Sequence, residues 1–210
     1  MDERPRLYGA GYSVYVRIAR LALSEKGVDY DLVPVDVFAG EGLTPPHRGR
    51  HPFGRIPAFE HGDFALYETG AIVRYVDEAF EGPRLQPAGL RERARCNQII
   101  GVADAYAYRS LVWDIYVERV ERPAEGRAPD EARIAAALPV ARTCLNAVSD
   151  LMGEQPWLAG AELSLADLYL APMIAYFVQA PEGEAMLRAH GRLAQWWERI
   201  AARPAMRATA

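Results

Sequence analysis

The stretch from Arg55 to Val76, RIPAFEHGDFALYETGAIVRYV, gathers residues that are suited to holding a small charged ligand. An Ile-Pro pair opens an extended segment, a Gly turn follows, and a second short strand ends at Glu68 and Thr69, where a helix is predicted to begin. The first N–H groups of a helix lack partners within the helix, and together with the helix dipole they favour an anion. We therefore expect this stretch to hold a small ligand, with a helix start that favours an anion.

Two hydroxyl side chains, Tyr12 and Ser13, precede an earlier helix in SVYVRIARLALSEKG. Ser13 can cap the start of this helix and Gly27 can end it. A hydroxyl at a helix start can also donate a hydrogen bond to a bound anion, which stabilises the charged form. Ser13 thus has both a structural and a chemical interpretation, and capping does not exclude chemistry.

The first eighty residues are predicted to form the α/β framework that positions these groups. RLYGA and VDYDLVPVDV read as strands that pair in parallel through the intervening helix, and AGEGLTPPHRGRHPFG reads as a loop. IPAFE and FALY form an antiparallel hairpin, after which Ile72, Val76 and Phe80 mark the last helix. The predicted order is βαβ followed by ββα.

The rest of the chain is predicted to be all-helical. EGPRLQPAG has the composition of a linker, so we place a first domain at residues 1–82, a linker at 83–89 and a helical domain at 90–210. One helix is expected from about Leu90 to Glu121 and another from Pro129 to Met152. In ELSLADL, Ser164 and Asp167 form a capping box at the start of a further helix.

Composition excludes several classes of protein. The net charge of −4 and the pI near 5.6, with basic residues scattered among acids, give no basis for binding nucleic acid. The N-terminus is charged and lacks the apolar region of a leader peptide, and the apolar run from Leu163 to Val178 is too short to span a membrane, so we expect a buried core helix there. Cys96 and Cys144 have no metal-like spacing, so we expect no metal and a reduced, cytoplasmic protein.

Four segments, taken in order, resemble the cytosolic glutathione S-transferase family, and the likeness covers nearly the whole chain. SVYVRIARLALSEKG is similar to the first helix of that family, HPFGRIPAFEHGDFALYETGAIVRYV to its glutathione-site segment, WLAGAELSLADL to its buried capped helix and LAQWWERIAARPAM to its C-terminal helix and tail. Within the family, the chain resembles serine-type, phi- or theta-like bacterial members. This resemblance implies a thioredoxin-like domain joined to an all-α domain, a homodimer, and a role in detoxification.

The resemblance also implies how glutathione is bound as a cosubstrate. A cis peptide before Pro57 would turn the backbone N–H and C=O of Ile56 outward to pair with the cysteinyl unit. Thr69 would bind the γ-glutamyl carboxylate and Glu68 its ammonium group. Arg55 stands where relatives often carry Gln, and its guanidinium could pair with the glycine carboxylate.

Glutathione must lose its thiol proton to become a good nucleophile, because a free thiol of this type has a pKa of about 8.5. By resemblance to serine-type transferases, Ser13 is the first candidate to stabilise the thiolate, with Tyr12 as the alternative. The chain departs from the family in carrying Val14 where Pro is usual and His51 where Asn is common. It also lacks a His-Lys pair that some relatives use on the glycine carboxylate; we consider His47 and His51 as contributors, although a histidine in a loop is more often solvated.

The predicted function is transfer of glutathione to a hydrophobic electrophile. The helix DAYAYRSLVWDIY borders the electrophile pocket in the family, but its aromatic residues do not name the electrophile. Two alternatives stay open: a binding or interaction protein on the same fold that has little activity, and a glutathione-dependent isomerase, dehalogenase or peroxidase.

Overall fold

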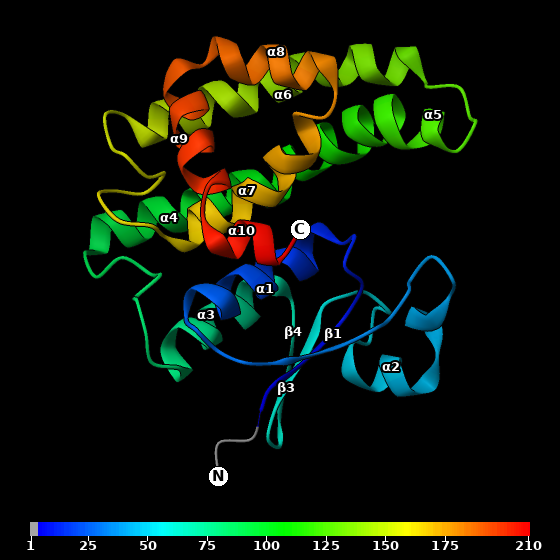
Figure 1. Ribbon diagram of the computed structural model, residues 1–210, viewed down its shortest axis with the longest axis vertical. Helices are drawn as coiled ribbons and strands as arrows, with labels where there is room; N and C mark the ends of the chain where they lie inside the picture. The colour runs from blue at the N-terminus through cyan, green and yellow to red at the C-terminus, as the bar shows by residue number, and fades with distance from the viewer. Residues whose placement is uncertain (1–3) are drawn as a thin grey trace. The chain divides into compact units, whose positions relative to one another are not determined.

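The computed structural model describes residues 4–210, which divide into two compact units (Figure 1). Unit 1 contains Met1–Leu85 and Pro204–Ala210, and unit 2 contains Gln86–Arg203. The first three residues lie outside the described residues. Both the predicted first domain and the charged N-terminus begin with them.

Unit 1 is built on a four-stranded mixed sheet in the order β2-β1-β3-β4. Strand β1 (Arg6–Tyr8) pairs in parallel with β2 (Asp31–Val33) and antiparallel with β3 (Ala58–His61), which forms a hairpin with β4 (Phe64–Tyr67). Leu7 is at the centre of the sheet, opposite Leu32 on one side and Phe59 on the other. The predicted βαβ-ββα order is confirmed.

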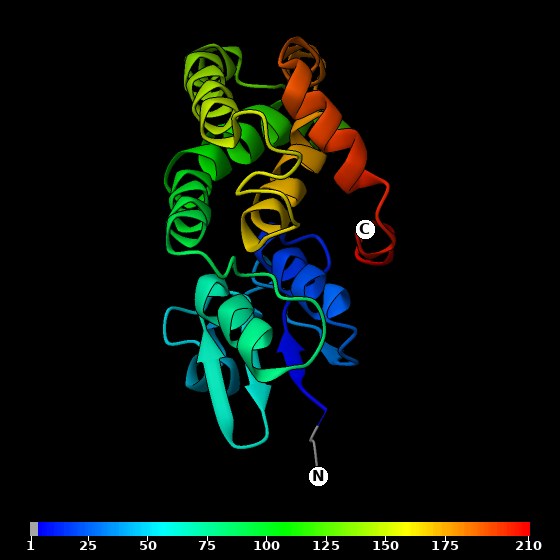
Figure 2. The same cartoon turned by 90° about the vertical axis from the view of Figure 1, so that its left-hand side faces the viewer.

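Two amphipathic helices of unit 1 pack together and bury their apolar stripes. Helix α1 (Val14–Glu25) and helix α3 (Thr69–Ala79) lie side by side (Figure 2), on one side of the strands in Figure 1. Ile18 and Leu21 of α1 and Ile72 and Val76 of α3 are fully buried. The predicted spacing of Ile72 and Val76 therefore marks the face of α3 that joins the core.

The segment predicted as a loop contains helical structure, so that prediction was wrong in part. A 3-10 turn, η1 (Glu41–Leu43), is followed by helix α2 (Pro45–Arg50), which lies on the other side of the strands from α1 and α3 (Figure 1). Proline suits the first turn of a helix because its missing N–H would have no partner there, and basic residues in the last turn suit the helix dipole. Six residues are too few to show helical periodicity, so the Gly and Pro content dominated the prediction.

The C-terminal tail packs on α1, which explains its place in unit 1, whereas the sequence grouped residues 90–210 as one helical domain. Arg17 donates to the carbonyl of Met206 at 3.0 Å, and Arg20 donates to those of Thr209 at 3.0 Å and Ala208 at 3.2 Å. Figure 1 shows the short helix α10 (Pro204–Ala208) beside α1. Cations near carbonyls at the end of a helix are favourable, so these arginines hold the tail in place.

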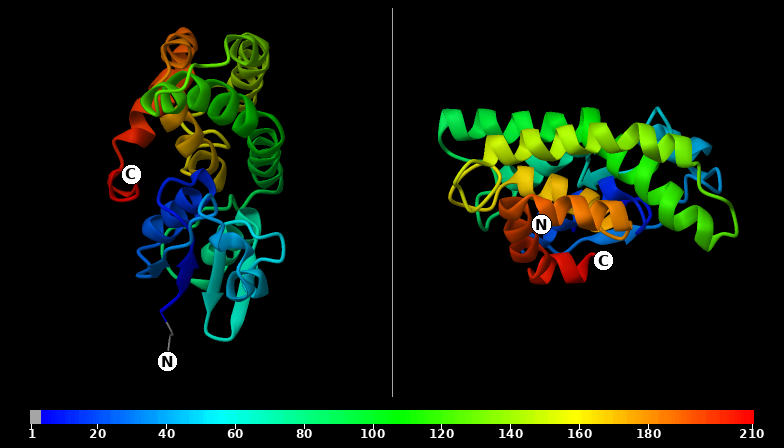
Figure 3. Two further views of the ribbon diagram at one scale, coloured as in Figure 1. Left: turned by 90° about the vertical axis from the view of Figure 1, so that its right-hand side faces the viewer. Right: turned by 90° about the horizontal axis from the view of Figure 1, so that it is seen from above.

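Unit 2 is all-helical. Helix α4 (Leu90–Val102) continues directly into a π-helix, η2 (Ala103–Glu121), and a short α5 (Arg122–Ala124), so the single helix expected from 90 to 121 changes its hydrogen-bond pattern midway. Helix α6 (Glu131–Met152) runs beside η2 (Figure 3). The chain continues with α7 (Leu165–Phe177), α8 (Pro181–Ala189) and α9 (Gly191–Ala201). Within residues 4–210, no helix has the length and apolar character needed to cross a membrane.

The predicted capping box starts α7, and its acid serves several partners. Asp167 is fully buried and accepts hydrogen bonds from the backbone and hydroxyl of Ser164, the backbone N–H of Leu158 and the indole of Trp196. Burial raises the pKa of Asp167, although all four hydrogen bonds act to lower it. The cap thus joins α7 to the loop before it and to α9, and α7 is the buried core helix that the sequence predicted.

Candidate functional site

Ser13 stands immediately before α1, as predicted. Its backbone is extended, and its hydroxyl oxygen accepts a long hydrogen bond of 3.4 Å from the N–H of Val16. A serine hydroxyl can accept and donate at the same time. Because its hydrogen has no acceptor among residues 4–210, the half-buried Ser13 keeps one donor for a ligand.

Tyr12, the alternative to Ser13, directs its phenol elsewhere. The phenol donates to a carboxylate oxygen of Asp36 at 2.8 Å, and Asp36 also accepts from the backbone N–H groups of Phe38 and Ala39. Burial, the hydrogen bond to Asp36 and the charge of Asp36 together raise the pKa of Tyr12 to about 12. Sequence reasoning missed Asp36, since no local pattern connects it with Tyr12.

The extended edge around Ile56 has the predicted geometry. The Ile56–Pro57 peptide is cis, as expected from the resemblance. The Ile56 side chain packs against a small cluster formed by Tyr8, Val35 and Ala58. Its backbone N–H and C=O form no hydrogen bond with any residue in the described range 4–210, so an extended ligand can pair with them.

Glu68 and Thr69 form the start of α3. Glu68 has φ 70° and ψ 114°, and it is the one non-glycine residue with positive φ among those that the structure describes. Such a conformation costs about 1–3 kcal/mol and is found mostly where a site requires it. The Glu68 carbonyl accepts from the N–H groups of Ala71 and Ile72, which leaves those of Thr69 and Gly70 without a partner in the described part of the chain.

The side chains around this helix start differ in exposure and charge. Glu68 is exposed and its carboxylate does not cap the helix, whereas Thr69 is buried. Unpaired N–H groups at a helix start attract a carboxylate, and an exposed carboxylate beside them attracts an ammonium group. Gly70, whose N–H completes this group, was not identified from the sequence because it contributes only its backbone.

Arg55 places a positive charge immediately before the extended segment at Ile56. Its side chain is exposed, and within residues 4–210 its guanidinium has no carboxylate or carbonyl partner. Its carbonyl accepts a hydrogen bond of 2.7 Å from Nε2 of His47. The backbone before Ile56 is therefore fixed, while the guanidinium remains able to bind an anion.

His47 and His51 are buried, although a histidine in a loop is more often solvated. His47 is 3% exposed and His51 2% exposed, and their rings stack with centroids 6.4 Å apart. Burial lowers the pKa of His51, and the charges of His47 and Arg55 act in the same direction, while Glu68 opposes them. The four-residue spacing between His47 on α2 and His51, which caps the end of that helix, was the signal that could have placed both rings on one side, had the helix been predicted.

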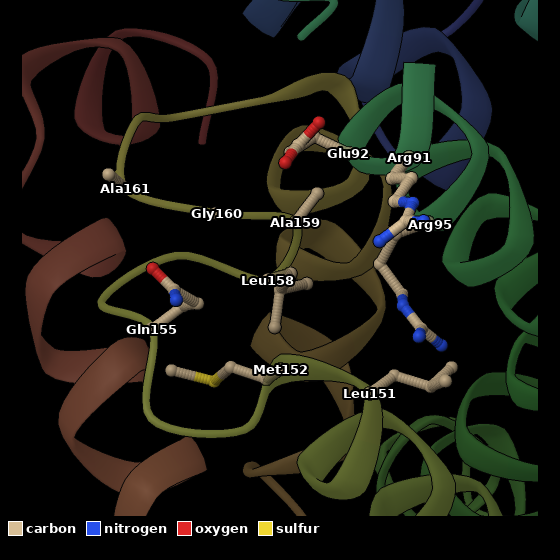
Figure 4. Close-up of a pocket in the computed structure, with 10 residues that line it drawn as sticks. All are labelled: Arg91, Glu92, Arg95, Leu151, Met152, Gln155, Leu158, Ala159, Gly160 and Ala161. Carbon is tan, nitrogen blue, oxygen red and sulfur yellow. The ribbon is translucent and has the colours of Figure 1, made fainter. Parts of the chain in front are cut away.

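The described residues line two cavities of note, one in each unit. One of about 540 Å³ in unit 1 is lined by Tyr8, Glu41, His47 and Arg50 among others. Another of about 420 Å³ in unit 2 lies between Arg91 and Arg95 of α4 and the segment from Leu151 to Ala161 (Figure 4). Of the residues considered for the site, His47 lines the first cavity, and neither cavity is lined by Tyr12, Ser13, Arg55, Ile56, Pro57, Glu68 or Thr69. Residues 4–210 contain no group of acids, histidines and cysteines that could hold a metal ion.

Comparison with known proteins finds two family models on this chain. Residues 7–84 match the N-terminal domain of glutathione S-transferases, and residues 131–199 match their C-terminal domain. The first match contains the whole segment from Ser13 to Thr69, and so every residue of the candidate site.

Individual relatives extend the likeness over nearly the full length. Glutathione S-transferase 4 of Zea mays is 34% identical over 201 residues, which is 95% of this chain and 89% of the relative. The crystal structure of glutathione transferase F7 from Populus trichocarpa superposes with a TM-score of 0.87 and 32% identity, covering 98% of this chain and 97% of that one. Glutathione S-transferase-I bound with the ligand lactoylglutathione superposes with a TM-score of 0.88 and 28% identity over 99% and 98% of the two chains.

Proposed function

The chain belongs to the glutathione S-transferase family, and we propose that Ser13 stabilises the thiolate of glutathione in the reaction that the family performs. The protein is a glutathione transferase: glutathione is its cosubstrate, and the thiolate attacks an electrophilic carbon of a hydrophobic molecule. The observation that carries the role of Ser13 is its hydroxyl, which caps α1 as an acceptor and still has a hydrogen to donate.

The binding of glutathione is proposed to use the edge and the helix start together. The backbone of Ile56 pairs with the cysteinyl unit, and the N–H groups of Thr69 and Gly70 with the Thr69 hydroxyl hold the γ-glutamyl carboxylate. The carboxylate of Glu68 holds the ammonium group. Arg55 binds the glycine carboxylate, which is supported by the lack of any other partner for its guanidinium within residues 4–210.

The chemical step depends on lowering the pKa of the bound thiol. A hydrogen bond from Ser13 to sulfur, helped by the dipole of α1, stabilises the thiolate, and each unit of pKa lowering corresponds to about 1.4 kcal/mol. The thiol proton leaves to solvent. The sulfur then forms a bond to the electrophilic carbon, and that carbon either releases a leaving group or passes its electron pair to an acceptor atom that is protonated.

Tyr12 is proposed to serve the electrophile instead of the thiol. Its phenol is held by Asp36, and its ring stacks on Phe38 with centroids 5.3 Å apart. Both rings are accessible, Tyr12 at 42% and Phe38 at 72%. An exposed aromatic pair next to Ser13 offers an apolar surface to a hydrophobic cosubstrate.

The ultraviolet absorbance of the glutathione thiolate, measured on the protein as pH is varied, tests the role of Ser13. The wild type is expected to bind glutathione with a depressed thiol pKa, and Ser13→Ala is expected to return that pKa toward its free value. An unshifted thiol in the wild type would favour a binding protein without transferase activity. A return to the free value in Tyr12→Phe but not in Ser13→Ala would assign the thiol to Tyr12.

We also propose that the protein is a homodimer. Several large apolar side chains of unit 1 are exposed, among them Phe53 at 70% and Phe38 at 72%, and apolar side chains that gather in a patch mark a protein-protein contact. Sedimentation velocity over a range of concentrations tests this proposal. A single species with the mass of one chain at every concentration would contradict it.

A cytoplasmic location is likewise proposed. It is supported by Cys96 and Cys144, which are both buried and neither of which forms a disulfide, a state that suits a reducing compartment. Fractionation of the source cells, with the protein detected by antibody, tests the location, and recovery only outside the cytoplasmic fraction would contradict it.

A further inference from the structure

Two buried imidazoles adjoin the backbone that is proposed to bind glutathione. His47 lies in α2 and His51 follows the last residue of that helix, with the N–H of His51 donating to the carbonyl of His47 at 2.8 Å. Both are more than nine-tenths buried, and a polar ring so placed normally has hydrogen-bond partners. The two rings differ in the partners that they have.

His47 has a defined structural role. A carbonyl oxygen only accepts, so Nε2 of His47 must carry the hydrogen that it donates to the Arg55 carbonyl. Its Nδ1 is then an acceptor, and it has no partner among the described residues. His47 is thereby committed to holding the backbone before Ile56.

The ring of His51, by contrast, is not held by a hydrogen bond from any residue in the described chain. Its Nδ1 is buried without a partner there. Its ring lies 4.9 Å from that of Tyr67 and 6.2 Å from that of Phe53, measured between centroids. It therefore lies between two segments, one of which leads from Phe53 to Arg55 and the other from Tyr67 to Glu68.

The charges around His51 belong to the proposed glutathione site. The rings that adjoin it are those of His47 on α2 and Tyr67 at the end of β4, and the charges that act on it are those of His47, of Arg55 on the segment after α2 and of Glu68 before α3. Burial disfavours the cation, and Arg55 and His47 add to this, which lowers the pKa of His51. Glu68 alone favours the cation, so the charge state of His51 depends on what neutralises Arg55 and Glu68.

We propose that His51 is a further recognition residue of the glutathione site, which takes up a proton as the anionic ligand binds. This inference rests on the proposed binding mode, in which the glycine carboxylate pairs with Arg55. That pairing offsets the positive charge that disfavours a cation at His51. The ligand's ammonium at Glu68 acts in the opposite direction, but glutathione carries two carboxylates and one ammonium, so the net change favours the protonated ring.

The proposed proton uptake fixes the direction in which ligand affinity changes with pH. Because binding raises the pKa of His51, affinity for a glutathione analogue increases as pH falls through the interval between the free and bound pKa values. Above the bound value and below the free value, His51 contributes no pH dependence. Each unit of difference between the two values corresponds to about a tenfold change in affinity.

Isothermal titration calorimetry with S-hexylglutathione isolates this proton, because the analogue has no thiol hydrogen to release. The titration is done at about pH 6, close to the pH at which an imidazole titrates. It is repeated in two buffers that differ in ionisation enthalpy, cacodylate and Bis-Tris. The wild type is expected to take up a fraction of a proton on binding. His51→Asn is expected to bind without uptake, while the matched control His190→Asn, which removes a histidine of unit 2, keeps the uptake.

The outcomes separate this inference from the proposed function. Binding by the wild type without proton uptake would overturn the role of His51 and leave the glutathione site standing, as would undiminished uptake in His51→Asn. Failure of the wild type to bind S-hexylglutathione would overturn the proposed site itself, and the inference with it.

A measurement on the wild type keeps the inference testable if His51→Asn does not fold. The chain has four histidines, whose ring nitrogens can be followed by NMR as pH is varied. One imidazole with a lowered pKa in the free protein is expected to shift upward on saturation with S-hexylglutathione. If no imidazole pKa rises on binding, the inference is wrong.

Discussion

The phenolic oxygen of Tyr12 lies 2.8 Å from a carboxylate oxygen of Asp36, and this hydrogen bond gives the phenol of Tyr12 a different environment from the neighbouring hydroxyl of Ser13. Ser13 keeps a donor at the start of α1, while the hydrogen of Tyr12 is committed to a carboxylate that also accepts from two backbone N–H groups. The raised pKa of Tyr12, about 12, means that its phenol stays protonated at neutral pH and continues to donate to Asp36. Two adjacent residues that are alternatives in the sequence therefore have different environments in the fold.

Tyr12→Phe is expected to leave the pKa of the bound glutathione thiol unchanged, because the lost hydrogen bond ends on Asp36 and not on the ligand. With the aromatic ring retained, kcat should change by less than roughly threefold, which is about 0.7 kcal/mol. Steady-state kinetics with 1-chloro-2,4-dinitrobenzene, alongside Ser13→Ala, measures this. A loss in Tyr12→Phe as large as that in Ser13→Ala would contradict the division of roles.

Glu60 should make stability depend on pH at the acid end. Burial would raise its pKa, but hydrogen bonds from Tyr8 at 2.6 Å and Arg50 at 2.9 Å, with the charges of Arg50 and Arg6, outweigh burial and hold the pKa below its ordinary value. A carboxyl with a lowered pKa stabilises the fold fully above its ordinary pKa of 4.5, and this stabilisation is lost as pH falls through the folded-state value.

Glu60→Gln removes that dependence. Urea unfolding from about pH 7 down to about pH 3 is expected to show a stability difference between wild type and variant that is largest at neutral pH and shrinks in acid. Glu81→Gln, at an exposed carboxylate, is the matched control. A difference that stays constant across the range would show that Glu60 does not titrate with folding.

Local signals predicted much of this fold, and contacts between distant residues account for what was missed. The β3–β4 hairpin and the Ser164–Asp167 cap follow from residues within a few positions of each other, so their patterns are visible in the sequence. The hydrogen bond from Tyr12 to Asp36 joins residues 24 apart, and the burial of His51 depends on rings from α2 and β4. Neither contact has a local signature.

The helical parts show the same limit. Helix α2 was missed because six residues are too few to show helical periodicity. The π-helix from Ala103 to Glu121 was predicted as ordinary helix because π-helices are rare and occur mostly as single turns. The placement of the tail on α1 depends on hydrogen bonds from Arg17 and Arg20 to carbonyls of residues 206–209. No local pattern in the sequence predicts these contacts.

Asp167→Ala is expected to destabilise unit 2 strongly. The change leaves the backbone N–H groups of Leu158 and Ser164, the Ser164 hydroxyl and the Trp196 indole without their acceptor in a buried place. Unpaired buried donors cost about 1–3 kcal/mol each and do not add fully, so a loss of roughly 3–5 kcal/mol is expected in urea unfolding. Asp150→Ala, at an exposed position of α6, should change stability by less than about 0.5 kcal/mol. Equal effects in the two variants would contradict the role of the cap.

Thr69→Ala should weaken glutathione binding without slowing the bound complex. The hydroxyl is proposed to bind the γ-glutamyl carboxylate, and a hydrogen bond to a charged group contributes about 1.5–3 kcal/mol, so KM for glutathione should rise roughly tenfold to a hundredfold. The kcat at saturating glutathione should change little, because this contact is made equally in the ground state and the transition state. Thr69→Ser keeps the hydroxyl and should stay within a few-fold of the wild type. If Thr69→Ala binds glutathione as well as Thr69→Ser does, the carboxylate is held by the backbone N–H groups of Thr69 and Gly70 alone, and the hydroxyl has no part in binding.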